Sequence, residues 1–132
     1  MNKHLDRVKR IGRVQRQLAD LAQWRLAGLE RAEAALVESQ RQMIEAIGRD
    51  EGYCGPLAAV VARHVRGIER QIESAAASRQ LQTDAARVQG GRTKLADQAV
   101  IAADLIHRAQ RERKDLAELI ERSLGAAKTS SG

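Results

Sequence analysis

Proline occurs once in this chain, at position 56, where it ends the one stretch whose composition is typical of a loop. That stretch, Gly48–Pro56, contains three glycines and reads Gly-Arg-Asp-Glu-Gly-Tyr-Cys-Gly-Pro. Glycine is the usual residue just beyond the end of a helix, and proline is well tolerated in the first turn of the next one. The sequence on each side has a helical pattern, so a loop here divides the chain into two helices of unequal length.

We expect the first helix over about residues 3–48, the loop over about 49–55 and the second helix over about 56–125. At about 1.5 Å per residue, the two helices would be roughly 68 Å and 105 Å long. The predicted fold is all-α: an antiparallel two-helix coiled-coil hairpin with a longer second helix, forming one domain over 1–125. Residues 126–132 are small and polar and are expected to be a disordered tail.

The alternative architecture is a three-helix bundle in which Gly90-Gly91 makes a second turn. No Pro, Asn or Asp supports a turn at these two glycines, and the apolar period continues across them. The two-helix hairpin is therefore the favoured prediction.

The composition also favours long helices over a compact core. Apolar residues make up 43% of the chain, but 23 of them are alanine and phenylalanine is absent. Alanine favours helix, whereas a globular core needs larger side chains to fill it. No run of about 18 apolar residues occurs, so membrane insertion is not expected. The single Cys54 suits a reducing compartment, so we expect a cytoplasmic protein.

Apolar residues recur every three or four positions in both predicted helices. In the second helix this stripe shifts phase near Ser78 and continues through Leu81, Val88 and Leu95, so a change of supercoil is expected there. Pairing the helices along the stripes gives a definite register toward the N-terminus. The predicted contacts are Leu18 with Val88, Ile11 with Leu95, and Leu5 with Ile101.

The second helix is too long for the first helix to cover, so residues 100–124 are expected to lack a neighbour within the hairpin. Leaving apolar surface in water forfeits about 25 cal/mol for each Å² that could be buried. This segment is therefore predicted to bind a partner or to self-associate. Its uncovered apolar residues are expected to be Val100, Ile101, Leu105, Ile106, Leu116, Leu119, Ile120 and Leu124.

Positive charge gathers at the N-terminus. The chain has a formal net charge of +6, and its first sixteen residues contain six Lys or Arg but one Asp. A basic segment can bind nucleic acid or an acidic protein surface. No aromatic residues are interleaved for base stacking, so nucleic acid is the less favoured partner. The candidate partner-binding residues are Arg7, Lys9, Arg10, Arg13, Arg16, Leu116, Leu119 and Ile120.

No catalytic or metal-binding arrangement is recognisable, so we expect neither an enzyme nor a cofactor. Asp104 and His107 stand one helical turn apart, but a di-metal site in a bundle needs a second such pair and bridging glutamates. His64 lies beside the apolar stripe and is predicted to flank the helix contact. Cys54 has no histidine near it in sequence or in the proposed pairing, so it is not expected to be a nucleophile.

The order of a basic first helix, a loop at one third of the chain and a longer second helix resembles the FliJ-like family. These proteins are the central-stalk coiled coils of flagellar and related type III export ATPases. The resemblance covers nearly the whole chain. It is carried by Leu5-Asp6-Arg7-Val8-Lys9-Arg10-Ile11, Gln17-Leu18-Ala19, and Arg25-Leu26-Ala27 leading into Leu29-Glu30.

This resemblance implies a stalk whose paired ends insert into a hexameric export ATPase, promoting ring assembly and coupling the ring to the export gate. It also implies contact with export chaperones and a place in the cytoplasm, at the periphery of the inner-membrane export apparatus. Two alternatives from the residues alone stay open. They are a homo-oligomeric coiled-coil scaffold and a basic nucleic-acid-binding helical hairpin.

Overall fold

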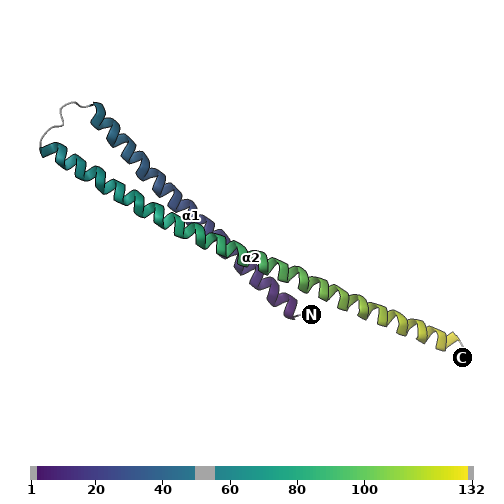
Figure 1. The fold of residues 1–132 in the computed structure, drawn as a ribbon. Coiled ribbons are helices and arrows are strands. Elements are labelled where there is room, and N and C mark those ends of the chain that lie inside the picture. The colour runs from purple at the N-terminus through teal and green to yellow at the C-terminus, as the bar shows by residue number, and fades with distance from the viewer. Residues whose placement is uncertain (1–2, 50–55, 131–132) are drawn as a thin grey trace. The chain divides into compact units, whose positions relative to one another are not determined.

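The computed structural model describes residues 3–49 and 56–130, which form two α-helices (Figure 1). Helix α1 spans Lys3–Arg49 and helix α2 spans Pro56–Ser130. The described residues are all helical, and α1 and α2 pack against each other. The predicted two-helix fold with a longer second helix is therefore confirmed. Most of the predicted loop, including Tyr53 and Cys54, lies outside the described residues.

Two details of the sequence prediction differ from the structure. Helix α2 is continuous through Gly90-Gly91, so the three-helix alternative is wrong. Helix α2 also continues to Ser130 rather than ending near 125, so residues 126–130 are helical and not a disordered tail. Small residues such as Ala126 and Ala127 have little or no side-chain entropy to lose in a helix, which is compatible with this extension.

Helix α1 is supported near its C-terminal end by ion pairs between residues three or four positions apart. Arg41 contacts Glu38 at 2.6 Å and Glu45 at 2.9 Å, and Arg49 contacts Glu45 at 3.3 Å. Residues at these spacings are neighbours on a helix surface. The ladder of charges therefore stabilises the last turns of α1 from within the helix itself.

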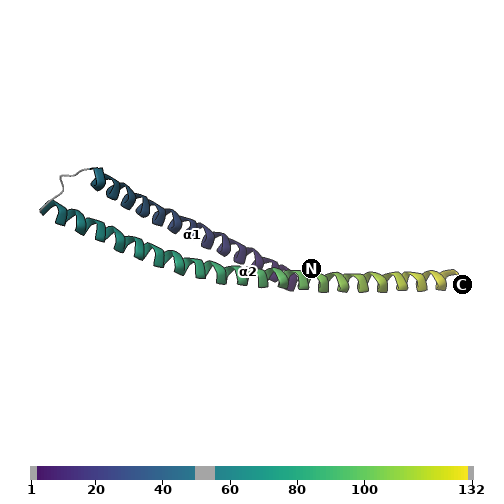
Figure 2. The ribbon, with the colours of Figure 1, turned by 45° about the horizontal axis from the view of Figure 1, so that its top comes forward.

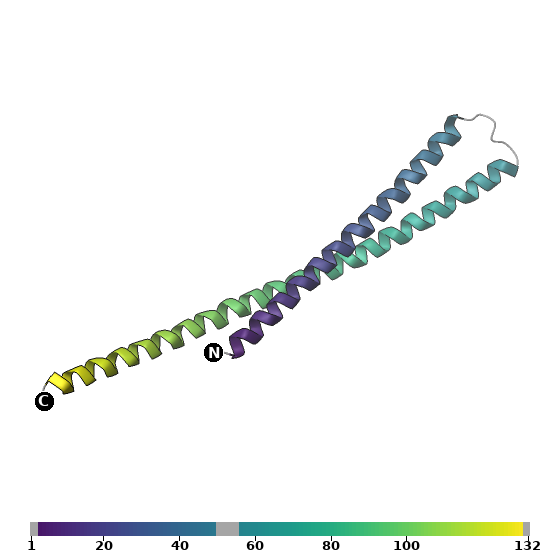
Figure 3. The same cartoon turned by 180° about the vertical axis from the view of Figure 1, so that it is seen from behind.

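The described chain forms two compact units, which we describe separately. The loop-side unit is Gln17–Gly90, and the terminal unit is Met1–Arg16 together with Gly91–Gly132. In each of them α1 and α2 run antiparallel, as Figure 3 shows for the loop-side unit, where the blue end of α1 lies along the teal start of α2.

In the loop-side unit, α1 and α2 pack through residues whose spacing along each helix alternates strictly between three and four positions. We call this set the contact face of that unit, and all its members are buried or half-buried. On α1 they are Ala19, Ala22, Leu26, Leu29, Glu33, Leu36, Gln40, Met43 and Ile47. On α2 they are Val61, Val65, Ile68, Ile72, Ala75, Arg79, Gln82, Ala86 and Gln89.

Polar side chains occupy several of these contact positions and bond across the helix pair. Gln82 donates a hydrogen bond from Nε2 to the carbonyl oxygen of Ala22 at 3.1 Å, and Arg79 forms an ion pair with Glu33. Among the described residues, every side-chain nitrogen or oxygen atom that is shielded from water has a hydrogen-bond partner. Burying these polar groups is tolerable because they are paired.

The terminal unit continues the same alternation. Its contact face consists of Leu5, Val8, Gly12 and Gln15 on α1, and Thr93, Ala96, Val100, Ala103 and His107 on α2. Thr93 donates a hydrogen bond from Oγ1 to the carbonyl oxygen of Gln15 at 3.1 Å. A Cβ atom placed on Gly12 would lie 3.3 Å from Cγ2 of Val100, so the absence of a side chain allows the two helices to approach closely here.

The contact face does not follow the phase shift of the apolar stripe near Ser78. Contact positions keep the three–four alternation through Arg79, Gln82, Ala86 and Gln89, and α1 keeps it as well. The apolar side chains that begin the packing, Val61 and Ile68 among them, set this phase. Changing it would require local over- or underwinding of one helix. The contact face therefore continues through polar and small residues instead of following the larger apolar side chains.

Candidate partner-binding surfaces

Exposed apolar side chains of the terminal unit lie one residue before the contact positions. Ile11 and Val14 precede Gly12 and Gln15 on α1, and the corresponding residues on α2 are Leu95, Ala99, Ala102 and Ile106. One residue corresponds to a rotation of about 100° around the helix axis. Because α1 and α2 are antiparallel, one step back along either helix turns toward the same side of the pair. We call these six exposed residues the apolar face.

An ion pair locates the opposite side. Arg16 and Asp97 each follow a contact position by one residue, and Arg16 Nη2 lies 3.2 Å from Asp97 Oδ1. Residues one step after the contact positions therefore share a side, and the apolar face lies on the other. We call the side of Arg16 and Asp97 the charged face. It also carries Asp6, Lys9, Arg13, Lys94, Asp104 and Arg108.

These positions correct the predicted N-terminal register. Leu95 is 67% exposed and Val88 is 53% exposed, and Ile11, Leu18 and Ile101 are exposed as well. The predicted contacts of Leu18 with Val88, Ile11 with Leu95, and Leu5 with Ile101 are therefore wrong. Leu5 is buried, but it is buried on the contact face with Ala103 rather than on the stripe of Leu95.

Helix α2 continues beyond the part that α1 covers. Figure 2 shows the N-terminal turns of α1 beside α2, and α2 extending past them to its C-terminal end. Every residue from 108 to 128 is exposed, including Leu116, Leu119 and Ile120. We call residues 108–130 the extension. Val100 was expected to be uncovered, but it is half-buried against Gly12, so the uncovered segment begins later than predicted.

Leu116 and Ile120 of the extension continue the apolar face, because they keep the spacing of Leu95 and Ile106 along α2. The positions that would continue the contact face are polar at Gln110, Lys114 and Glu121, but Ala117 and Leu124 also lie on them. Beyond the part that α1 covers, the contact-face side of α2 therefore becomes more polar, while the apolar face continues.

The predicted basic cluster is divided by the helix pair. Lys9, Arg13 and Arg16 belong to the charged face, where Arg16 already pairs with Asp97. Arg7 lies on the side of the apolar face, and Arg10 points away from the contact face, because it stands two residues after Val8 and two before Gly12. The five basic residues therefore lie on different sides of α1.

Excess positive charge nevertheless belongs to the terminal unit as a whole. This unit contains 14 of the 23 Lys and Arg residues but 7 of the 17 Asp and Glu residues, a formal net charge of +7. The loop-side unit has a formal net charge of −1. A field of this sign favours the approach of acidic partners to the terminal unit.

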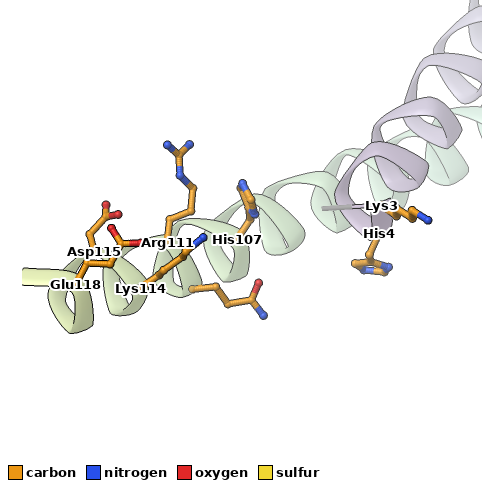
Figure 4. Close-up of a pocket in the computed structure, with 8 residues that line it drawn as sticks. Lys3, His4, His107, Arg111, Lys114, Asp115 and Glu118 are labelled. Atoms are coloured by element: carbon orange, nitrogen blue, oxygen red, sulfur yellow. The ribbon is translucent and has the colours of Figure 1, made fainter. Parts of the chain in front are cut away.

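An open groove lies where the first turn of α1 meets α2. Figure 4 shows Lys3 and His4 from α1, with His107, Arg111, Lys114, Asp115 and Glu118 along α2. Both signs of charge line this groove. Asp104, which the sequence placed one turn from His107, forms an ion pair with Arg108 at 3.1 Å. Within residues 3–49 and 56–130, no three His, Cys, Asp or Glu residues gather as metal ligands would.

The loop-side unit has exposed apolar surface of its own. Leu18, Leu21, Leu81 and Val88 are exposed, and each precedes a contact position by one residue. Trp24 is also exposed and borders a shallow groove with Arg25, Gly28, Leu29 and Gln82. His64 lines a groove with Met43 and Val60 beside the contact face, which agrees with its predicted flanking position.

Comparisons of the chain with protein-family models, with curated proteins and with solved structures gave no match. Over the described residues, neither helix contains a segment long and apolar enough to cross a membrane.

Sequence reasoning found the exposed apolar stripe of α2 but assigned it to the wrong role. Leu81, Val88 and Leu95 were read as core because they are the largest apolar residues in that stretch. A signal for the true contact face was present in the strict alternation that starts at Val61 and reaches His107. It was missed because polar residues occupy several of its positions.

Proposed function

We propose that this protein is a non-enzymatic stalk or adaptor of a flagellar or type III protein-export apparatus. The extension of α2, together with the basic first turns of α1, enters the ring of the export ATPase. It promotes ring assembly and couples the ring to the export gate or to export chaperones. The protein acts in the cytoplasm, at the periphery of the inner-membrane export apparatus.

The observation that carries this proposal is the exposure of every residue from 108 to 128, Leu116, Leu119 and Ile120 among them. Isolated helical segments of this length are marginal in water, and their apolar side chains gain stability when they are buried. A ring that surrounds the extension would provide that burial. The net charge of +7 on the terminal unit would guide the protein toward an acidic ring surface.

ATP hydrolysis by the cognate export ATPase tests the proposal. The full chain should raise the hydrolysis rate and the fraction of ATPase assembled as rings. The triple variant Leu116→Ala, Leu119→Ala, Ile120→Ala should lose most of this effect. The matched control, Leu81→Ala with Val88→Ala, removes exposed apolar side chains from the loop-side unit and should retain it. Unchanged hydrolysis and ring assembly with the full chain would contradict the proposal.

A basic nucleic-acid-binding hairpin is the second candidate, because the terminal unit carries all of the excess positive charge of the chain. Binding to DNA or RNA through about six phosphates should weaken by orders of magnitude between about 50 and 200 mM salt. A steep salt dependence, without any effect on the export ATPase, would favour this candidate over the stalk.

A further inference from the structure

The apolar face of the terminal unit has the dimensions of a helix-binding surface. It lies along α2 from Leu95 to Ile106 and includes Ile11 and Val14 from α1. With the arginines at either end, Arg92 and Arg113, it spans 22 residues, or about 33 Å of helix. Its side chains come from two adjacent helices, so a third helix could pack against both of them.

Two small side chains lie between large ones on this face. Ala99 and Ala102 lie between the larger Leu95 and Ile106, and all four are exposed. Such a surface offers recesses into which the large side chains of another helix can pack. A lipid surface would not need these recesses. The described part of the terminal unit also lacks Trp, Tyr and Phe, which are common on helices that lie on membranes.

The charges around this face are mainly positive. Arg7, Arg92 and Arg113 lie on the same side of their helices as the apolar face, and Arg10 and Glu112 lie farther out, on the sides of α1 and α2 that point away from the helix contact. Within the described residues, Arg7 and Arg113 have no ion-pair partner. Asp6, Asp97 and Asp104 all belong to the charged face instead. A second copy of this chain would place arginine near arginine, whereas an acidic helix would neutralise Arg7, Arg92 and Arg113.

We infer that the apolar face is a docking site for an acidic amphipathic helix supplied by a partner protein. The partner helix has large apolar residues at heptad spacing that enter the recesses around Ala99 and Ala102. Its flanking Glu or Asp residues lie near Arg7, Arg92 and Arg113. The apolar residues of this site all precede residue 108, where the extension begins, and Arg113 alone of the named residues lies within the extension. Docking at this site therefore does not require the proposed insertion of the extension into an ATPase ring.

The experiment uses the full chain and two fluorescein-labelled synthetic peptides of three heptads. Both peptides carry leucine at the a and d positions, with glutamate at e and g in one and lysine in the other. Fluorescence anisotropy should show saturable binding of the glutamate peptide and no binding of the lysine peptide. Replacing Arg7 and Arg113 by glutamate should reverse this preference.

Two isoleucines provide a matched pair of variants. Ile106 on the apolar face is 58% exposed, and Ile101 on the charged face is 62% exposed. Ile106→Glu should weaken binding of the glutamate peptide by about tenfold or more, while Ile101→Glu should change it by less than about twofold. Circular dichroism of both variants should match that of the unaltered chain, because neither side chain is buried.

Four results would overturn the inference. The first is no saturation by the glutamate peptide, and the second is an equal loss of binding in both isoleucine variants. The third is that vesicles rich in phosphatidylglycerol bind the chain through Ile106 while the glutamate peptide does not. The fourth is that the free chain forms a dimer in sedimentation equilibrium and that Ile106→Glu abolishes it, since a second copy would then be the occupant.

Discussion

Gly12 and Val100 mark a close approach of α1 and α2 in the terminal unit, where a Cβ atom on Gly12 would lie 3.3 Å from Val100 Cγ2. A larger residue at position 12 should therefore push the helices apart. We expect Gly12→Leu to lower the free energy of unfolding by about 1–3 kcal/mol, the range for overpacking. Urea denaturation followed by circular dichroism measures this change.

Gly91 is the matched control, because a Cβ added there would have no atom within 4 Å beyond its own chain neighbours and the nearby backbone of α2. Gly91→Leu should stabilise the chain by up to about 1 kcal/mol, since glycine is a poor helix former. If the two leucine variants had equal stability, the close approach at Gly12 would be wrong.

Two leucines of the terminal unit should respond differently to truncation. Leu5 is 6% exposed on the contact face, whereas Leu95 belongs to the apolar face. We expect Leu5→Ala to cost about 1–3 kcal/mol and Leu95→Ala to cost less than about 0.5 kcal/mol. Thermal denaturation of both variants measures the difference. If Leu95→Ala lost more stability than Leu5→Ala, the register predicted from the apolar stripe would be correct and the contact face described above would be wrong.

The ion pair of Arg79 with Glu33 should behave as a unit within the loop-side contact face. Replacing either residue alone by an apolar one leaves the other partly buried and unpaired, at an expected cost of about 1–2 kcal/mol. The double variant Glu33→Leu, Arg79→Met should recover most of that loss, because an apolar pair can replace a buried ion pair. A double-mutant cycle in urea checks this, and strictly additive losses would contradict it.

Glu38 gives a defined pH dependence. The hydrogen bond from Arg41 holds the pKa of the Glu38 carboxyl below its usual value, with the positive charge of Arg41 acting in the same direction. A lowered pKa in the folded chain means that the stabilisation is present above the pKa of the unfolded chain. It is lost as the pH falls through the folded pKa.

Helicity should therefore fall as the pH is lowered below about 4, and Glu38→Gln should remove part of this dependence. Circular dichroism at 222 nm between pH 7 and pH 2 is the measurement. Arg41→Gln should have the same effect, because the pair acts together. An unchanged titration in both variants would show that Arg41 does not stabilise the Glu38 carboxylate.

The fold was predictable from the sequence because its signals are local. Pro56 and its neighbouring glycines mark the loop, and the three–four spacing of apolar residues marks both helices. The extent of α2 was less predictable. The small residues after Leu124 are compatible with both helix and disorder, and the glycines at 90 and 91 with both helix and turn.

The contact face of the terminal unit was not predictable from hydrophobicity, because α2 carries two stripes of heptad spacing there. The stripe of Leu95 and Ile106 is the more apolar, while the stripe of Thr93 and Val100 is in phase with the packing nearer the loop. Phase along a continuous helix decides between them. The sequence thus showed the candidate surface as an apolar stripe, but only the structure showed that this stripe is exposed.

Disulfide formation tests most directly the central claim that α1 covers Val100 and leaves Leu95 exposed. In a Cys54→Ser background, the pair Gly12→Cys, Val100→Cys should form an intramolecular disulfide rapidly under mild oxidation, because these positions lie face to face. The pair Ile11→Cys, Leu95→Cys should cross-link slowly, since both positions point to the exposed side. Faster cross-linking of the second pair would contradict the assignment of the apolar face.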